Sequence, residues 1–376
     1  MLFSFRWPPM AALSMHFVFG GLAVLGGVSA VAAAPIYNVI DLGALDGNET
    51  VAFGINNSGQ IAGYAATVGN LQFRAMMFSA SGGIDLGTLG GSDSVAYAIN
   101  NSGQIVGEAA TPGNGSYHAA LFGISGNVDL GTLGGNYAYA RGISENGQIV
   151  GYGGAFRSDA YHAGLFSTSG NIDLGTLGGN YSAAYAVNNS GQVVGYAETR
   201  VRGTYHAALF STSGNIDLGT LGGTASSAID INNSGQIVGY ADTPANGTYH
   251  ATLFSTSGNT DLGTLGGRSS GAFGINDSGQ VVGQSQLSDG TLDAFIWMDG
   301  VMTSLDLLTD PTWDLNHAWD INDLGQISAV GIDSSRNRHA LLLTLAPTDG
   351  NTVPEAATIL LVGVALFALR TVPRKR

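Results

Sequence analysis

Ile99-Asn100-Asn101-Ser102-Gly103-Gln104-Ile105-Val106-Gly107 is the stretch that decides the fold, because close copies of it recur along the chain. Its Gly-Gln pair returns every 44 residues, with the last copy slightly late, at Gly59, Gly103, Gly147, Gly191, Gly235, Gly279 and Gly325. Asp-Leu-Gly keeps the same step, at Asp41, Asp85, Asp129, Asp173, Asp217 and Asp261, with a degenerate copy at Asp306. Two markers with one period define seven units of a repeat protein.

Residues 85–128 show what one unit builds. Val95–Ile99 alternates large and small side chains, as a strand with two unlike faces does. The turn Asn100–Gly103 follows, where Asn and Ser cap the turn and Gly accepts a positive φ. Further strands are expected at residues 104–109, 118–122 and 128–130.

Four short antiparallel strands in 44 residues are typical of one blade of a β-propeller, and a stacked solenoid is the competing arrangement. Residues 37–42 form a lone fourth strand, whereas the last unit supplies only three, at 317–321, 326–330 and 339–345. The first strand can therefore complete the last blade, which removes exposed sheet edges. We expect an all-β, seven-bladed propeller over residues 35–348, closed by the N-terminal strand; six or eight blades remain open.

The two ends of the chain lie outside this propeller. Residues 1–34 carry Arg6, an apolar run and small residues near Ala32 and Ala33, and this order is typical of a secretory signal peptide. Residues 349–376 contain the apolar stretch 359–369 and a basic tip, a hydrophobic helix too short to span a relaxed bilayer comfortably. The chain has no cysteine, so packing alone must stabilise it.

The C-terminal segment begins with Val353, Pro354 and Glu355 and resembles the PEP-CTERM sorting signal. Ala356 stands where that signal has a second proline. The resemblance implies an exosortase-type processing enzyme as a partner, and a cell-surface or extracellular location with transient or retained inner-membrane anchoring through the C-terminus. A simple C-terminal membrane anchor is the alternative.

The recurring Leu-Gly-x-Leu-Gly-Gly, Ile-Asn-x-x-Gly-Gln-Ile-Val-Gly and His-Ala-x-Leu-Phe together resemble the HAF-family extracellular repeat. The resemblance spans residues 41 to about 345 and implies a secreted bacterial repeat protein without a defined activity.

The charge of the body limits its partners. Residues 36–353 hold 26 Asp or Glu against 8 Arg and no Lys, a net charge of −18. Such a surface repels phosphate backbones and anionic lipids, so we expect no nucleic acid, and membrane contact only through the C-terminal helix.

The repeated histidines and aspartates are the first candidates for chemistry. His118, His162, His206, His250 and His339 occur once per unit, and Arg74 and Asp293 take their place in two others. Equivalent positions of different blades diverge from the axis, so we expect each histidine to bond a neighbouring turn and to hold no metal. The Asp of Asp-Leu-Gly is expected to stabilise the turn in which it lies. No nucleophile elbow or phosphate-binding loop occurs, so the sequence predicts no cofactor and no enzyme activity.

The loops between the second and third strands vary, and in repeat proteins such variation on one face carries specificity. Four of these loops end in Tyr, and three of the eight body arginines fall in them. The candidate ligand-binding residues are Tyr117, Tyr161, Tyr205, Tyr249, Arg157, Arg200 and Arg202. Aromatic rings beside Arg suit sugar rings or an acidic partner chain. The alternative is that each Tyr covers the end of its blade.

The sequence thus favours an exported, non-catalytic binding or structural protein that recognises exopolysaccharide or another surface protein of the matrix. The exopolysaccharide rests on the sorting-signal resemblance. A secreted hydrolase of glycans or esters is the second hypothesis, with its site in residues 284–337. That segment gathers Asp289, Asp293, Asp299, Asp310, Asp314 and Asp320 with Trp297, Trp313 and Trp319. The third hypothesis is a self-assembling surface structural protein.

Overall fold

The computed structural model describes residues 36–43, 49–123, 126–157, 159–245 and 247–347. The expected signal peptide and sorting segment lie outside the described residues. Within them the chain is all-β, with 28 strands, two short 3₁₀ turns, η1 (Val68–Asn70) and η2 (Leu305–Leu307), and no α-helix. No helix in this part of the chain is long and apolar enough to cross a membrane.

The described strands form five four-stranded sheets and one eight-stranded sheet. One sheet contains β2 (Thr50–Ile55), β3 (Ile61–Ala66), β4 (Phe73–Ser79) and β5 (Gly82–Asp85). The eight-stranded sheet contains β6 (Ser94–Ile99), β7 (Ile105–Ala110), β8 (Tyr117–Phe122), β9 (Val128–Gly131), β10 (Gly134–Ile143), β11 (Ile149–Ala155), β12 (Tyr161–Phe166) and β13 (Ile172–Gly175). Its two halves meet at one parallel bridge, between Tyr137 and Tyr117.

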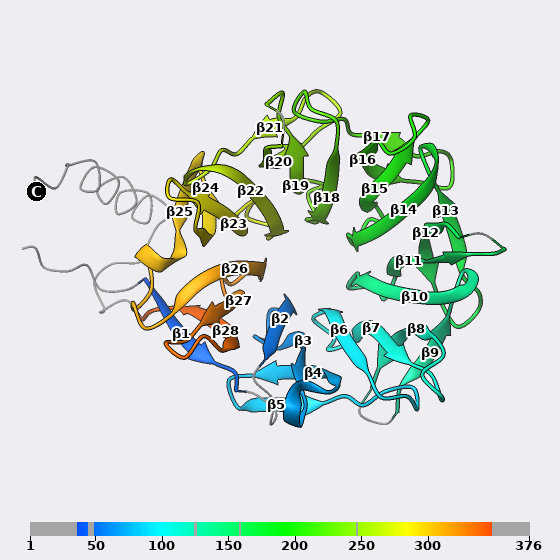
Figure 1. Cartoon of the computed structure of the whole chain (residues 1–376), viewed down its shortest axis with the longest axis horizontal. Coiled ribbons are helices and arrows are strands. Elements are labelled where there is room, and N and C mark those ends of the chain that lie inside the picture. Colours follow the sequence, from blue (N-terminus) through cyan, green and yellow to red (C-terminus); the bar gives the residue numbers. More distant parts are fainter. Residues whose placement is uncertain (1–35, 44–48, 124–125, 158, 246, 348–376) are drawn as a thin grey trace, which may run out of the picture. The chain divides into compact units, whose positions relative to one another are not determined.

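The remaining sheets repeat the same antiparallel order. They are β14 (Gly178–Val187), β15 (Val193–Thr199), β16 (Tyr205–Phe210) and β17 (Ile216–Asp217); β18 (Ser226–Ile231), β19 (Ile237–Asp242), β20 (Tyr249–Phe254) and β21 (Thr260–Asp261); and β22 (Gly266–Ile275), β23 (Val281–Leu287), β24 (Leu292–Met298) and β25 (Val301–Ser304). The last sheet joins β26 (Asp314–Ile321), β27 (Ile327–Ile332) and β28 (Arg338–Leu345) to β1 (Tyr37–Asp41). Within residues 36–347 the sheets follow one another in a β-propeller-like ring (Figure 1).

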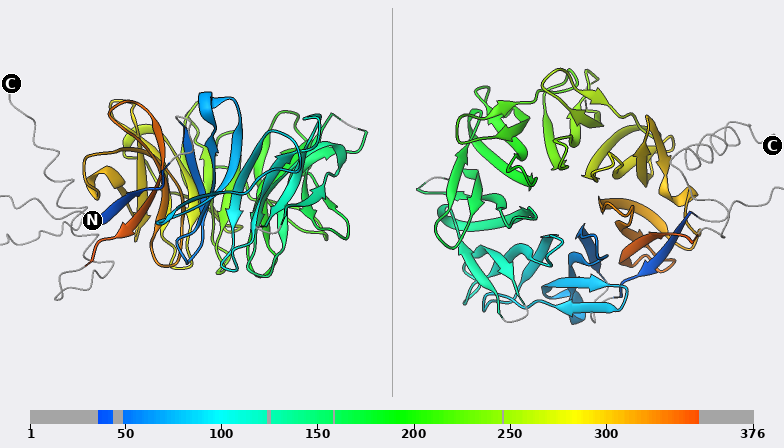
Figure 2. Two further views of the ribbon diagram at one scale, coloured as in Figure 1. Left: turned by 90° about the horizontal axis from the view of Figure 1, so that it is seen from below. Right: turned by 180° about the vertical axis from the view of Figure 1, so that it is seen from behind.

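The two ends of this ring meet through β1 and β28. These strands pair antiparallel, from Tyr37 opposite Leu345 to Asp41 opposite Leu341. The sequence predicts this pairing, since the first strand lacks a sheet of its own and the last unit lacks a fourth strand. Figure 2 shows β1 lying along the red-orange C-terminal strand in both further views.

The core is divided among the contacts between neighbouring sheets. Ala96, Ile105 and Phe122 of one sheet share a buried cluster with Ala62 and Ala75 of the preceding sheet. Small side chains dominate these contacts because successive sheets converge on one axis. The closing sheet also shares a buried cluster with its neighbour, because its Ala340 and Leu342 pack with Ile61 and Phe78 of the first sheet. Removing this apolar surface from water contributes roughly 25 cal/mol per Å².

The glycine of Ile-Val-Gly has a steric reason. A Cβ atom at Gly107 would lie 1.9 Å from the carbonyl oxygen of Val95 on the adjacent strand. The equivalent glycines leave 1.8 to 2.0 Å, at Gly63, Gly151, Gly195, Gly239 and Gly283. The pairing of β6 with β7 shifts register between Ala96 and Ala98, and such a bulge presses the innermost strand against its neighbour. Only glycine fits this close approach.

Candidate functional site

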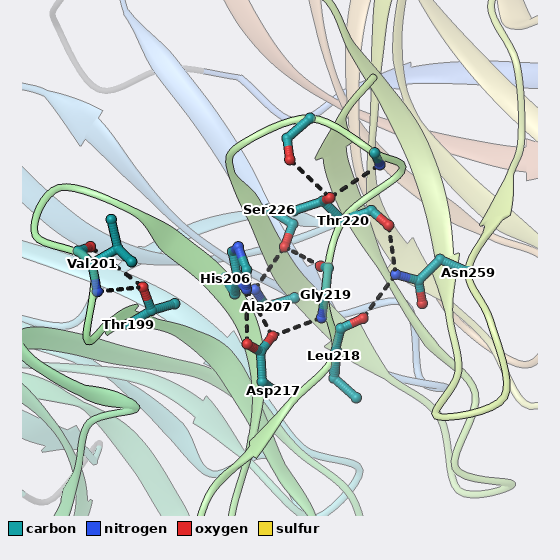
Figure 3. A network of polar contacts seen from close by, with 12 residues as sticks. Thr199, Val201, His206, Ala207, Asp217, Leu218, Gly219, Thr220, Ser226 and Asn259 are labelled. Atoms are coloured by element: carbon teal, nitrogen blue, oxygen red, sulfur yellow. Dashed lines mark hydrogen bonds and ion pairs between the residues drawn. The ribbon is translucent and has the colours of Figure 1, made fainter. Parts of the chain in front are cut away.

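The repeated histidine bonds the turn that follows the outermost strand (Figure 3). His206 Nδ1 lies 2.9 Å and 2.8 Å from the two carboxylate oxygens of Asp217. Asp217 Oδ1 also accepts the backbone N–H of Gly219 at 2.8 Å. Ser226, on the innermost strand of the next sheet, accepts the N–H of Ala207 and donates to the Gly219 carbonyl. His, Asp and Ser therefore lock two outer strands to the next sheet.

The same bond recurs around the ring. The pairs are His118–Asp129, His162–Asp173, His250–Asp261 and His339–Asp41, with Arg74–Asp85 and Ser304–Asp293 in the units that lack the histidine. Each histidine thus bonds a neighbouring turn, in agreement with the structural role expected from the sequence. The described residues contain no group of three or more side chains placed to hold a metal ion.

A second repeated network surrounds the axis at the Asn-Asn-Ser-Gly turns. The backbone N–H of one turn donates to the side-chain oxygen of the next, at 2.7 to 3.1 Å. The series closes on itself through Asn57, Asn101, Glu145, Asn189, Asn233, Asp277 and Asp323, here called the turn ring. A polar cavity of about 170 Å³ lies at its centre.

The predicted tyrosines lie on the opposite side of the sheets from the turn ring, at the starts of β8, β12, β16 and β20. Three of these rings contact other tyrosines. Tyr161 lies 5.7 Å from Tyr152 and 5.0 Å from Tyr181, centroid to centroid. Its hydroxyl bonds that of Tyr196 at 2.8 Å, and so joins two sheets. Tyr205 packs on Tyr196 and Tyr249 on Tyr240. Covering the blade ends is thus one role of these rings, although all four retain exposed surface.

The three predicted arginines are exposed in the loops of two adjacent sheets. Arg157 lies over the Phe156 ring at 4.8 Å and lines a cavity of about 490 Å³ with Tyr137 and Asp159. Arg200 and Arg202 belong to the β15–β16 loop, which Glu198 holds by accepting the N–H groups of Gly203 and Asn180 at 2.7 Å and 2.6 Å. These bonds, that from Gly203 first, keep the pKa of Glu198 below its usual value.

The acidic residues of 284–337 have separate local roles. Asp310 and Asp289 each cap a turn through the N–H of the residue two positions on. Buried Asp293 accepts from Ser304 Oγ, and Asp306 accepts the N–H of Leu315. Only Asp320 of the six proposed aspartates faces the ring axis, where it lines a cavity.

That cavity, here called the axial chamber, has a volume of about 380 Å³ and is lined by the innermost strands of every sheet. Six aromatic side chains line it. Phe53 lies 5.5 Å from Tyr97 and 5.2 Å from Trp319, and Phe273 lies 5.1 Å from Trp319, between ring centroids. Arg141 stands in the same wall, its guanidinium carbon 3.9 Å from the Tyr97 centroid. Asp230 lines both this chamber and the polar cavity within the turn ring.

Two aspartates complete the chamber. Asp230 accepts the N–H groups of Ile231 and Ile275, and Asp320 those of Ile321 and Ile55, all at 2.8 to 2.9 Å. Each carboxylate thus bonds its own strand and the next sheet. Burial raises the pKa of Asp230 to about 6, and burial followed by repulsion from Asp230 raises that of Asp320 to about 8.

Alignment of the repeats contains the signal for this chamber. The innermost strands place Phe53, Tyr97, Arg141, Tyr185, Ile229, Phe273 and Trp319 at one equivalent position, and Gly54, Ala98, Gly142, Ala186, Asp230, Gly274 and Asp320 at the next. Two departures from these patterns carry charge. Arg141 stands at a mainly aromatic position, and Asp230 and Asp320 stand at a position that is otherwise Gly or Ala. Sequence reasoning directed at loop variation misses them.

Comparison with known proteins gives a limited result. Residues 167–252 match a family model described as a protein of unknown function (DUF3466). No curated protein matches the chain. Among solved structures, TolB from Acinetobacter baumannii is similar at 12% identity and a TM-score of 0.44, over 76% of this chain and 63% of that one. The chain therefore spans less than two thirds of the length of that structure.

Proposed function

We propose that this chain is an exported seven-bladed β-propeller that binds an extracellular polysaccharide or another matrix protein and catalyses no reaction. Seven repeat units and the closed turn ring support the blade number. The signal-like residues 1–34 and the sorting-signal resemblance at Val353, Pro354 and Glu355 support export to the surface and processing by an exosortase-type enzyme.

The observation that carries the binding function is the loop face, defined by Tyr117, Tyr161, Tyr205, Tyr249, Arg157, Arg200 and Arg202. Its cavity of about 490 Å³ combines Arg157 with Tyr137 and Asp159. Exposed guanidinium groups give local positive charge on a body that is otherwise strongly acidic. Flat tyrosine faces with hydrogen-bonding edges suit sugar rings. A polysaccharide that lies along two adjacent sheets could contact all three arginines.

The test is a titration of purified full-length protein with exopolysaccharide from the native host. We expect Arg157→Ala to weaken binding about tenfold or more, because a charge-assisted hydrogen bond contributes roughly 1.5–3 kcal/mol. Arg336→Ala is a matched control, because Arg336 is also an exposed loop arginine with positive φ, 68° against 55° for Arg157. The control should bind like the parent. Equal losses in both variants, or no binding of polysaccharide or matrix protein by the parent, would contradict the proposal.

A further inference from the structure

The axial chamber contains one guanidinium group, that of Arg141, for which the described residues supply no hydrogen-bond acceptor. Among the described residues, no hydrogen bond or ion pair joins the Arg141 side chain to an acceptor; its contacts are with Tyr97 and Tyr185, at 3.9 Å and 5.6 Å from the ring centroids. By contrast, Arg74 is paired with Asp85 and Arg338 with Glu49. A guanidinium has five donors in a planar fork that matches a carboxylate. Arg141 therefore presents unused donors to the chamber that it lines.

Glu108, an acidic side chain outside the chamber that interacts electrostatically with Arg141, does not occupy these donors. Glu108 accepts the Tyr97 hydroxyl at 2.8 Å, and its other carboxylate oxygen is buried without a hydrogen bond in the described structure. Glu108 is absent from the chamber lining. Burial raises its pKa to about 7, so a fraction of this group is neutral near neutral pH. The hydrogen-bond donors of Arg141 are thus left available to a ligand.

Two other residues of the chamber wall, Asp230 and Asp320, offer hydrogen-bonding groups. Every carboxylate oxygen of Asp230 and Asp320 accepts one backbone N–H. A carboxylate oxygen has two lone pairs, so each oxygen of Asp230 retains capacity for one more donor, whereas Asp320, whose raised pKa keeps it mostly protonated near pH 7, offers an O–H donor as well as an acceptor. The hydroxyl groups of a sugar are donors of this kind. Aromatic side chains, among them Phe53, Phe273 and Trp319, supply flat apolar surface in the same wall.

We propose that the axial chamber is a binding site for a small sugar acid, of the size of one hexuronate. Arg141 holds the carboxylate, Asp230 and Asp320 form hydrogen bonds with the hydroxyl groups, and the aromatic wall covers the sugar ring. The volume of about 380 Å³ lies at the lower end of the range for ligand pockets, which run from about 300 to 1,000 Å³. The polar cavity within the turn ring adjoins the chamber through Asp230 and provides the route of entry. This site is separate from the loop face and does not depend on it.

The test uses full-length protein and free D-glucuronate, with calorimetry and tryptophan fluorescence as readouts. Trp319 lines the chamber, so occupation should change its emission, and Trp319→Phe should remove that change. D-Glucose and L-glutamate separate the contributions of the carboxylate and the hydroxyl groups. We expect glucuronate to bind at least about tenfold more tightly than either, since each lacks one class of contact.

Arg141→Tyr is the decisive variant, because Tyr97 and Tyr185 occupy the equivalent positions of neighbouring units and the ring accommodates them. It should lose about tenfold or more in glucuronate affinity and keep its melting temperature. Arg141→Lys retains the charge without the fork and should fall between parent and Arg141→Tyr. Arg268→Gln, which removes the same charge from an exposed position outside the chamber, should bind like the parent.

Several outcomes would overturn the proposal. These are no binding of glucuronate by the parent, equal affinity for glucose, tighter binding of glutamate, or unchanged affinity in both Arg141 variants. Because the loop face is tested with polymer and with Arg157→Ala, failure of the chamber leaves the polysaccharide result standing, and the reverse also holds.

Discussion

The outer and innermost strands of each sheet differ in how strictly they repeat. On the outer strands the His–Asp bond, or a substitute such as Arg74–Asp85, recurs around the ring. On the innermost strands, one position changes from Phe53 to Arg141 to Ile229. The outer bond performs the same task in each unit, whereas the innermost positions face a common cavity in which each contributes differently. In this ring, variation on a strand can therefore indicate a site as well as variation in a loop can.

The largest loss of stability should follow removal of a side chain from a turn that ends an innermost strand. Buried Asn188 donates to Gln192 and to the Asn232 carbonyl, and accepts two backbone N–H groups. Asn188→Ala should reduce the free energy of unfolding by about 2–3 kcal/mol, because it leaves several buried polar groups unpaired. Denaturant unfolding measures this loss. Asn188→Ser copies Ser144 of another unit and should lose less; a loss as large as that of Ala would show that bonding at this position is unimportant.

Asp320 should make stability depend on pH. Its raised pKa means that the folded protein keeps a proton that the unfolded chain releases between about pH 4 and pH 8. The free energy of unfolding should therefore fall as pH rises through this window. In Asp320→Ala, which copies Ala98 and Ala186, that fall should be smaller, by at most about 1.4 kcal/mol per pH unit. Unfolding curves at pH 5 and pH 8 test this, and parallel pH profiles of parent and variant would contradict it.

The smallest effect is expected on the outer strands. His206→Ala removes one partly exposed bond to Asp217, and such exposed pairs contribute roughly 0–1 kcal/mol. We expect a loss of about 1 kcal/mol or less by denaturant unfolding, with Asp217→Asn somewhat larger because Asp217 also accepts from Gly219. If His206→Ala destabilised the protein more than Asn188→Ala, the bonds of the outer strands would contribute more to stability than those of the turns at the axis, contrary to our expectation.

Much of the strand order follows from local chemistry that a sequence displays. The turn at Asn100–Gly103 forms as expected, with Gly103 at φ 77°. The third strand begins one residue before the expected His118, because Tyr117 pairs with Ala110. That Asp230 and Asp320 line the same cavity could not be predicted in this way, because it depends on how the sheets are arranged around the axis and not on the sequence of any one repeat. The contacts of Tyr161 with Tyr181 and Tyr196 of the next sheet arise for the same reason.

The ring also has no privileged starting point. Ala346 donates its backbone N–H to the Ile36 carbonyl at 2.7 Å, so the two ends of the described body are neighbours. A short linker between them, with new ends opened in the exposed β15–β16 loop, would preserve every strand pairing in a different linear order. A circularly permuted protein should therefore fold to the same body, because strand pairing and side-chain packing, and not a covalent link, join the two ends of the ring at the closing sheet.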